Sequence, residues 1–202
     1  MSYLNRQQSI FEILPCKNAI CVFDPNSSFN KAKIYGTIKF HQCIRAEQVN
    51  GIPPSESHSQ NINFSTLIKF NLSGFKPNSV NAIHVHNLGD LTKGCDSLCA
   101  HYNPYQKMHG SKSLYGYDRH VGDLINNIHS DSDGNFIFEY EDDLVDLSGD
   151  YSIIGRSIVI HEKEDDCGKY RYEKSEKGIG SRTTGNAGAR ISCALIGIAG
   201  NC

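Results

Sequence analysis

The chain has 202 residues, which is enough for one well-buried core and too few for two comfortable domains. Its net charge of -2 and its pI near 6.5 give no general signal for binding nucleic acid or an anionic membrane, and we expect neither as a partner. No apolar run reaches the roughly 18 residues that a membrane-spanning helix needs.

The first residues, MSYLNRQQSIFEILPCKN, make a poor secretory signal, because Glu12 and Pro15 interrupt the apolar run and no credible cleavage site follows. We therefore expect a cytoplasmic protein. The chain contains eight cysteines, and in a reducing compartment most of them are expected to be free thiols.

Alternating apolar and polar residues predict half-buried strands along most of the chain. The predicted strands cover residues 19–24, 33–42, 62–71, 80–86, 124–130, 135–142, 151–162 and 191–199. Residues 43–61 contain Asn-Gly and Pro-Pro and are expected to form a surface insertion. Eight short strands with almost no helical periodicity indicate an antiparallel sandwich or barrel.

Potential metal ligands gather in the middle of the sequence. His84 and His86 flank one residue of a predicted strand, so both imidazoles lie on the same face, although such a pair alone is weak evidence for a metal. Five further candidates strengthen it: His101, His109, His120, Asp123 and His161. Three histidines and an aspartate suit tetrahedral Zn(II), and an all-imidazole set suits redox-active copper. Seven ligands for eight positions require one histidine to bind both ions.

The motifs around these residues occur in the order found in copper/zinc superoxide dismutases, and from residue 19 to residue 199 the chain resembles that family. The motifs are HVHNLGD, Gly94-Cys95, AHYNP, His109-Gly110, RHVGDL, LSGDYSIIGR, IVIHEKEDD, TTGNAGARISC and IGIA.

This resemblance implies an all-β fold, an eight-stranded antiparallel Greek-key barrel of the immunoglobulin-like sandwich type. Two long loops, 87–119 and 162–190, would form the metal site and its channel. The matching domain would cover residues 19–202, with residues 1–18 as an N-terminal extension.

The resemblance also assigns the ligands. Copper would be held by His84, His86, His101 and His161. Zinc would be held by His101, His109, His120 and Asp123, so that His101 bridges the two ions. Cys95 and Cys193 match the family's intrasubunit disulfide.

The implied activity is the disproportionation of superoxide to dioxygen and hydrogen peroxide by Cu(II)/Cu(I) cycling, with His101 supplying a proton. Arg190 matches the arginine that positions the anion, and a guanidinium suits this task because it is always charged. Thr184 matches the threonine that narrows the channel. Asp165 matches the aspartate that accepts hydrogen bonds from His84 and His109.

Partners are implied as well. The family is commonly a homodimer, and Leu88, Ile154, Gly155 and Ile198 fit its apolar interface. Family members that require a copper chaperone have prolines beside the channel arginine, where this chain has Ala189 and Ile191. The resemblance therefore suggests that copper loading without a chaperone is possible.

The second loop departs from the family pattern, because Thr183 replaces the usual lysine and the segment between His161 and Arg190 is longer. An alternative function is a copper-binding or copper-carrying relative with little activity. The chaperones of this family carry a C-x-x-C motif in a separate domain, whereas Cys16 and Cys21 have a different spacing.

Overall fold

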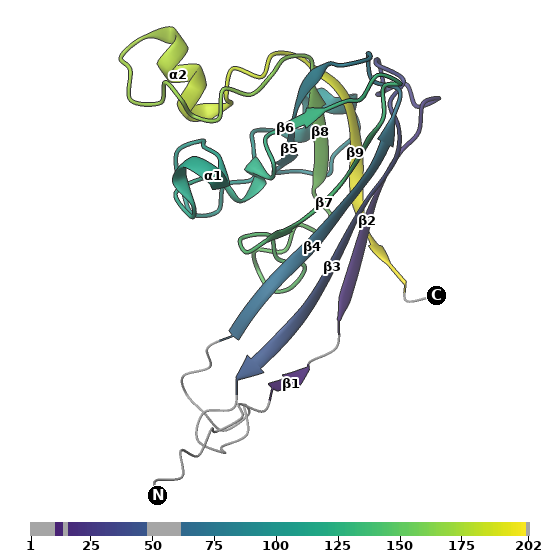
Figure 1. Ribbon diagram of the computed structural model, residues 1–202, viewed down its shortest axis with the longest axis vertical. Coiled ribbons are helices and arrows are strands. Elements are labelled where there is room, and N and C mark those ends of the chain that lie inside the picture. The colour runs from purple at the N-terminus through teal and green to yellow at the C-terminus, as the bar shows by residue number, and fades with distance from the viewer. Residues whose placement is uncertain (1–10, 14–15, 48–61, 201–202) are drawn as a thin grey trace, which may run out of the picture.

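The computed structural model describes residues 11–13, 16–47 and 62–200 (Figure 1). Its strands are β1 (Phe11–Ile13), β2 (Lys17–Phe23), β3 (Tyr35–Glu47), β4 (Ile62–Ser73), β5 (Val80–His86), β6 (Asn127–His129), β7 (Phe136–Asp142), β8 (Ser157–His161) and β9 (Arg190–Ala199). The helices are α1 (Lys112–Tyr115), α2 (Glu176–Thr183) and the 3-10 turns η1 (Gly94–Leu98) and η2 (Val121–Asp123).

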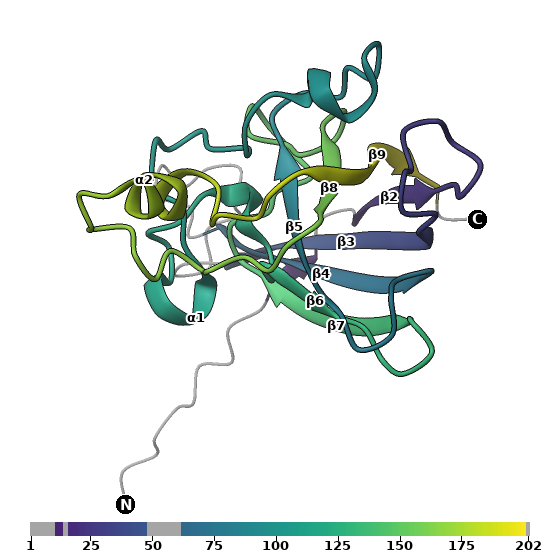
Figure 2. The ribbon, with the colours of Figure 1, turned by 90° about the horizontal axis from the view of Figure 1, so that it is seen from above.

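Hydrogen bonds join these strands in the order β6-β5-β8-β9-β2-β3-β4-β7, and β1 pairs with β3. Every pairing between named strands is antiparallel. Because β2 pairs with β9 and β5 with β8, strands far apart in the sequence become neighbours, as in a Greek key. Seen from above, β2, β3, β4 and β7 lie side by side and β5 crosses over them (Figure 2). The result is a nearly closed barrel, which confirms the predicted fold class.

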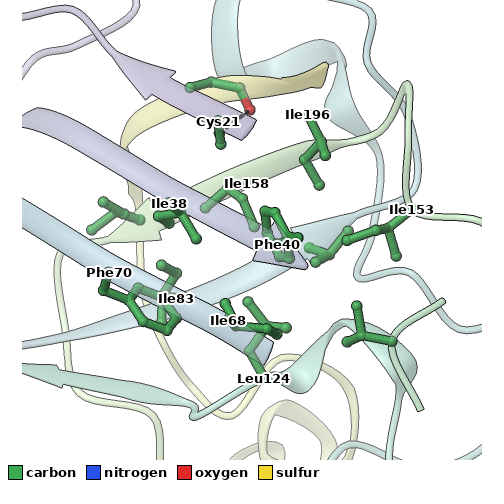
Figure 3. Packing of buried hydrophobic residues seen from close by; sticks show 14 of the residues in the cluster. Cys21, Ile38, Phe40, Ile68, Phe70, Ile83, Leu124, Ile153, Ile158 and Ile196 are labelled. Carbon is green, nitrogen blue, oxygen red and sulfur yellow. Dashed lines mark hydrogen bonds between the residues drawn. The ribbon is translucent and has the colours of Figure 1, made fainter. Parts of the chain in front are cut away.

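One hydrophobic core fills the barrel. Side chains from β3 and β4, such as Phe40 and Phe70, point toward Ile83 of β5 and Ile158 of β8 (Figure 3). The other face of β8 is buried too, because Val159 packs with Leu98 and with the buried disulfide between Cys95 and Cys193. The loop after β5 is thus held against the outside of the barrel.

Several predicted boundaries were wrong. β3 and β4 extend beyond residues 42 and 71, and residues 151–156 form a turn, leaving only 157–161 as a strand. The second long loop contains α2, which begins after Ser175, whose side chain accepts the Gly178 backbone N–H. Two glycines within its eight residues lower its helix propensity, which explains why the sequence showed no helical periodicity there. Residues 48–61 of the predicted insertion lie outside the described residues.

A second disulfide joins Cys16 and Cys43, which were expected to be free thiols; that expectation was wrong for this pair. Closing 27 residues is worth about 3 to 4 kcal/mol in the chain-entropy model. Cys21, Cys99 and Cys167 are free, and Cys202 lies outside the described residues. Within the described part of the chain, no helix is both long and apolar enough to cross a membrane.

A buried ion pair fastens the loop that carries several candidate ligands to the barrel. Arg119 lies next to His120 and places Nη2 2.9 Å from both carboxylate oxygens of Asp142 at the end of β7. Its Nη1 donates to the backbone carbonyl of His120. Both charged side chains have 0% exposure, so each depends on the other to offset the loss of water.

Replacing Arg119→Met should therefore destabilise the protein by about 3 to 5 kcal/mol, because the Asp142 carboxylate stays buried without its partner. Urea denaturation measures the change. Lys69→Met is the matched control, since the Lys69–Glu139 pair is 53% and 62% exposed and should contribute less than about 1 kcal/mol. Equal losses from the two variants would contradict the role of the buried pair.

Candidate metal centre

The outer face of β5 and β8 supports the centre. Ile83 and Val85 point into the barrel, so His84 and His86 point outward, where the two long loops cover them. The six histidines predicted as ligands are buried, and so is Asp123. Buried polar groups require partners, and here the ring nitrogens find them mainly in the carboxylates of Asp123 and Asp165 and in two backbone carbonyls.

Each of four imidazoles turns a ring nitrogen that carries no hydrogen toward one common space. His84 Nδ1 and His101 Nε2 are buried and have no hydrogen-bond partner. His86 Nδ1 lies 2.9 Å from the Cys99 carbonyl oxygen, and donating a proton there leaves Nε2 as a lone pair. His161 places Nε2 3.4 Å from His86 Nε2. One nitrogen from each ring lies within 4.8 Å of the others, a donor set that fits copper.

The second set centres on the Asp123 carboxylate. Its Oδ1 lies 2.9 Å from His109 Nδ1 and 3.1 Å from Nδ1 of both His101 and His120. Its Oδ2 accepts the backbone N–H groups of Gly110 and His120 at 3.0 Å. Three nitrogens and one oxygen converge, which fits tetrahedral Zn(II). His101 faces this set with Nδ1 and the first set with Nε2.

Asp165 joins the two sets. Oδ2 lies 2.6 Å from His84 Nε2, and Oδ1 lies 2.8 Å from His109 Nε2. A carboxylate that accepts both N–H groups orients both rings, so that Nδ1 of His84 faces the first set and Nδ1 of His109 faces Asp123. The structure thus brings Asp165 to the position that the sequence comparison implied.

Three residues around Asp165 were missed by sequence reasoning. Asn126 Nδ2 donates to Asp165 Oδ2, and Asn127 exchanges hydrogen bonds with the Asp165 backbone. Gly185 has a φ of +64°, and a Cβ there would lie 2.0 Å from Asp165 Oδ1. The Asn126-Asn127 pair closely follows the motif RHVGDL, and Gly185 lies within the motif TTGNAGARISC. Their role, however, becomes visible only from their contacts with Asp165.

The electrostatics favour neutral imidazoles in the first set. Burial, above all, lowers the pKa of His84, His86 and His101 well below the usual range, and that of His161 to about 4. Neutral rings keep the lone pairs that bind metal ions.

His109 differs from the other rings. Burial opposes its charge, but the carboxylates of Asp123 and Asp165 outweigh burial and raise the pKa to about 10. Burial would also raise the pKa of the Asp123 carboxyl, yet His109 and hydrogen bonds from three histidines hold it well below its usual value.

Arg190 lies beside the first set. Its guanidinium donates to the carbonyls of Cys95 and Cys99, and the Cys99 carbonyl also holds His86. Thr184 lies farther along the loop as the exposed C-terminal cap of α2, with its hydroxyl donating to Gly180. Its place at a channel mouth stays a prediction.

A family model for copper/zinc superoxide dismutase matches residues 34–196. The chain belongs to the copper/zinc superoxide dismutase family. A superoxide dismutase of Humicola lutea is 40% identical over 168 residues, or 83% of this chain and 93% of its own length. One from Schizosaccharomyces pombe is 43% identical over 152 residues, or 75% and 92%. The crystal structure of the clock protein EA4 is 33% identical with a TM-score of 0.63, covering 91% of this chain and 95% of its own.

The activity follows from this membership. The chain is an oxidoreductase that disproportionates superoxide, and its cofactors are copper and zinc, for which the buried histidine sets offer suitable donors. Nothing in the comparisons favours the alternative of a copper carrier with little activity.

The metal-free protein should be most stable near pH 6.5. As the pH falls, His161 of the unfolded chain takes up its proton at its ordinary pKa of 6.5, whereas in the folded protein its pKa is about 4. Between these two values protonation therefore favours the unfolded chain. This residue alone then costs about 1.4 kcal/mol per pH unit. The charged form of His109 stabilises the folded protein fully below pH 6.5. Above pH 6.5 this contribution to stability falls progressively, until it is lost near the folded pKa of about 10.

Urea denaturation of metal-free protein between pH 4.5 and 8.5 measures this dependence. His161→Gln should flatten the acid side, since it removes one of the titrating groups. Stability that rises as the pH falls from 6.5 to 4.5 would contradict the neutral state of these histidines.

Proposed function

We propose that the seven residues divide between the two ions as the convergence of their ring nitrogens suggests. The copper ligands are His84, His86, His101 and His161. The zinc ligands are His101, His109, His120 and Asp123. The observation that carries this proposal is His101, which directs one ring nitrogen toward Asp123 and leaves the other buried without a partner. Few buried rings have that arrangement unless an ion completes it.

Copper, when bound, supplies the one-electron redox couple, and zinc supplies a fixed positive charge. The protein's own part is to hold the rings and to handle one proton. His101 Nε2 is the atom placed to carry that proton between the two half reactions, because Nδ1 is held at the Asp123 side. Asp165 orients His84 and His109 so that the Nδ1 atom of each ring points toward its proposed ion.

Arg190 is proposed to position superoxide beside the copper ligands. The carbonyls of Cys95 and Cys99 accept from its guanidinium and fix its orientation. Its positive charge also contributes, after burial, to the lowered pKa of His86 and His161, which places the charge close to both rings. An anion arriving there meets a fixed cation with forked donors.

Arg190→Met should slow superoxide removal roughly tenfold or more while copper stays bound, because steering and orientation are lost but no metal ligand is. Stopped-flow decay of superoxide and metal analysis measure the two quantities. Lys39→Met is the charge-matched control on the exposed face of β3. An unchanged rate for Arg190→Met at moderate salt would rule out the proposed role.

A homodimer is the second proposal. Among the residues predicted for its interface, Leu88, Gly155 and Ile198 are exposed, while Ile154 is half-buried. Gly89 packs against Gly155 and the exposed side chain of Leu195, so apolar side chains gather there at the surface. An apolar surface of this kind is typical of a protein interface.

Ile198→Asp should dissociate the dimer, because it buries a charge at the apolar interface. Ile137→Asp on β7 is the matched control, since the two isoleucines are 80% and 78% exposed. Sedimentation equilibrium measures the mass in solution. A monomeric wild type would refute the dimer, and dissociation by Ile137→Asp alone would place the interface elsewhere.

Two further expectations from the sequence stay predictions. Copper loading without a chaperone rests on Ala189 and Ile191 at positions flanking Arg190. The cytoplasmic location rests on the composition of residues 1–18. Expression with and without a copper chaperone tests the first, and cell fractionation tests the second.

A further inference from the structure

A second group of metal-binding side chains lies on the outer face of β2 and β3. Cys43 and His41 are two residues apart on β3 and therefore point to the same side. The antiparallel register pairs Lys17 with Gln42 and Asn18 with His41, so Cys16 stands opposite Cys43. The neighbouring side chains Ala19 and Gln42 are buried, which confirms that the cysteines and His41 face away from the core.

The orientation of His41 is set by Asn18. His41 Nδ1 lies 2.6 Å from Asn18 Oδ1, an oxygen that can only accept, so this nitrogen carries the proton. The other nitrogen, Nε2, then keeps its lone pair and lies 3.1 Å from Cys43 Sγ. A histidine that donates its far N–H to an oxygen while turning the near nitrogen toward sulfur has the arrangement of a metal ligand.

We propose that Cys16, Cys43 and His41 form a zinc site that exists only when the Cys16–Cys43 disulfide is reduced. The sulfur atoms and a His41 nitrogen lie within 4.8 Å of one another. Two thiolates and an imidazole suit Zn(II), with water as the fourth ligand. The site is separate from the catalytic centre, and its presence or absence leaves the proposed catalytic roles unchanged.

The disulfide form and the zinc-bound form interconvert with a balanced transfer of electrons and protons. Two thiol groups of a reductant are oxidised to a disulfide and pass two electrons and two protons to the Cys16–Cys43 bond, giving two cysteine thiols. Zinc binding then releases both thiol protons. The Cys16–Cys43 bond is accessible to such a reductant because Cys16 and Cys43 are half-exposed, whereas Cys95 and Cys193 are buried.

The Cys16–Cys43 link lies beside the pairing of β1 with β3. β1, which immediately precedes Cys16 in the described chain, pairs with the end of β3 beyond Cys43. Figure 1 shows β1 at the lower end of β3, far from α2. In either form the link between Cys16 and Cys43 holds the start of β2 to β3, by a covalent bond when oxidised and through zinc when reduced.

The test uses the full protein with copper and zinc already at the catalytic centre. Protein is treated with a phosphine reductant or left oxidised, exposed to Zn(II) alone, passed through gel filtration and analysed for zinc. Reduced protein should retain one zinc per chain more than oxidised protein. With Co(II) in place of zinc, the reduced protein should show a sulfur-to-cobalt charge-transfer absorption.

The variants separate this site from other thiols. Cys16→Ser/Cys43→Ser should lose the additional zinc, whereas Cys99→Ser, which removes an exposed free thiol elsewhere, should keep it. His41→Gln should weaken binding at least tenfold, and Asn18→Ala about tenfold through the orientation of His41. Failure of reduced wild type to take up the additional zinc would overturn the proposal. So would uptake that persists in the double cysteine variant.

Discussion

The catalytic centre depends on the buried carboxylate of Asp165, which accepts from His84 on one side and from His109 on the other. One ring belongs to β5 of the barrel and the other to the loop between β5 and β6. Without that acceptor, two buried N–H groups would lose their partners and the rings would be free to turn. The geometry of both proposed ion sites therefore depends on a residue that belongs to neither ligand set.

Asp165 is itself held from several directions. Asn126 and Asn127 lie at the start of β6, and Gly185 gives the space that the Asp165–His109 contact needs. The segment between β5 and β6, which carries His101 and His109, is fastened to the barrel by the Cys95–Cys193 disulfide and by the Arg119–Asp142 pair. Rigid attachment matters because neutral, buried imidazoles can hold ions only if the rings stay in place.

The sequence predicted the strands well where polar and apolar residues alternate, as in β2 and β5, and less well where a continuous apolar run replaces the alternation. β8 is buried along its whole length, so its start could not be separated from the turn at residues 151–156. α2 escaped notice because its glycines weaken every helical signal. The Cys16–Cys43 bond escaped notice because nothing in their spacing shows that β2 and β3 place them opposite each other.

The sequence by itself determined the identity of the chemistry: which residue types are present, in which order, and how closely they match a family of metal enzymes. Only the tertiary structure decided which ring nitrogen faces which site. Tautomer and orientation follow from hydrogen bonds made by residues distant in the chain, such as Asp165 with His84 and His86 with the Cys99 carbonyl. The same reason applies to His41, whose free nitrogen is set by Asn18 across the strand pair, because local sequence carries no record of a partner on another strand.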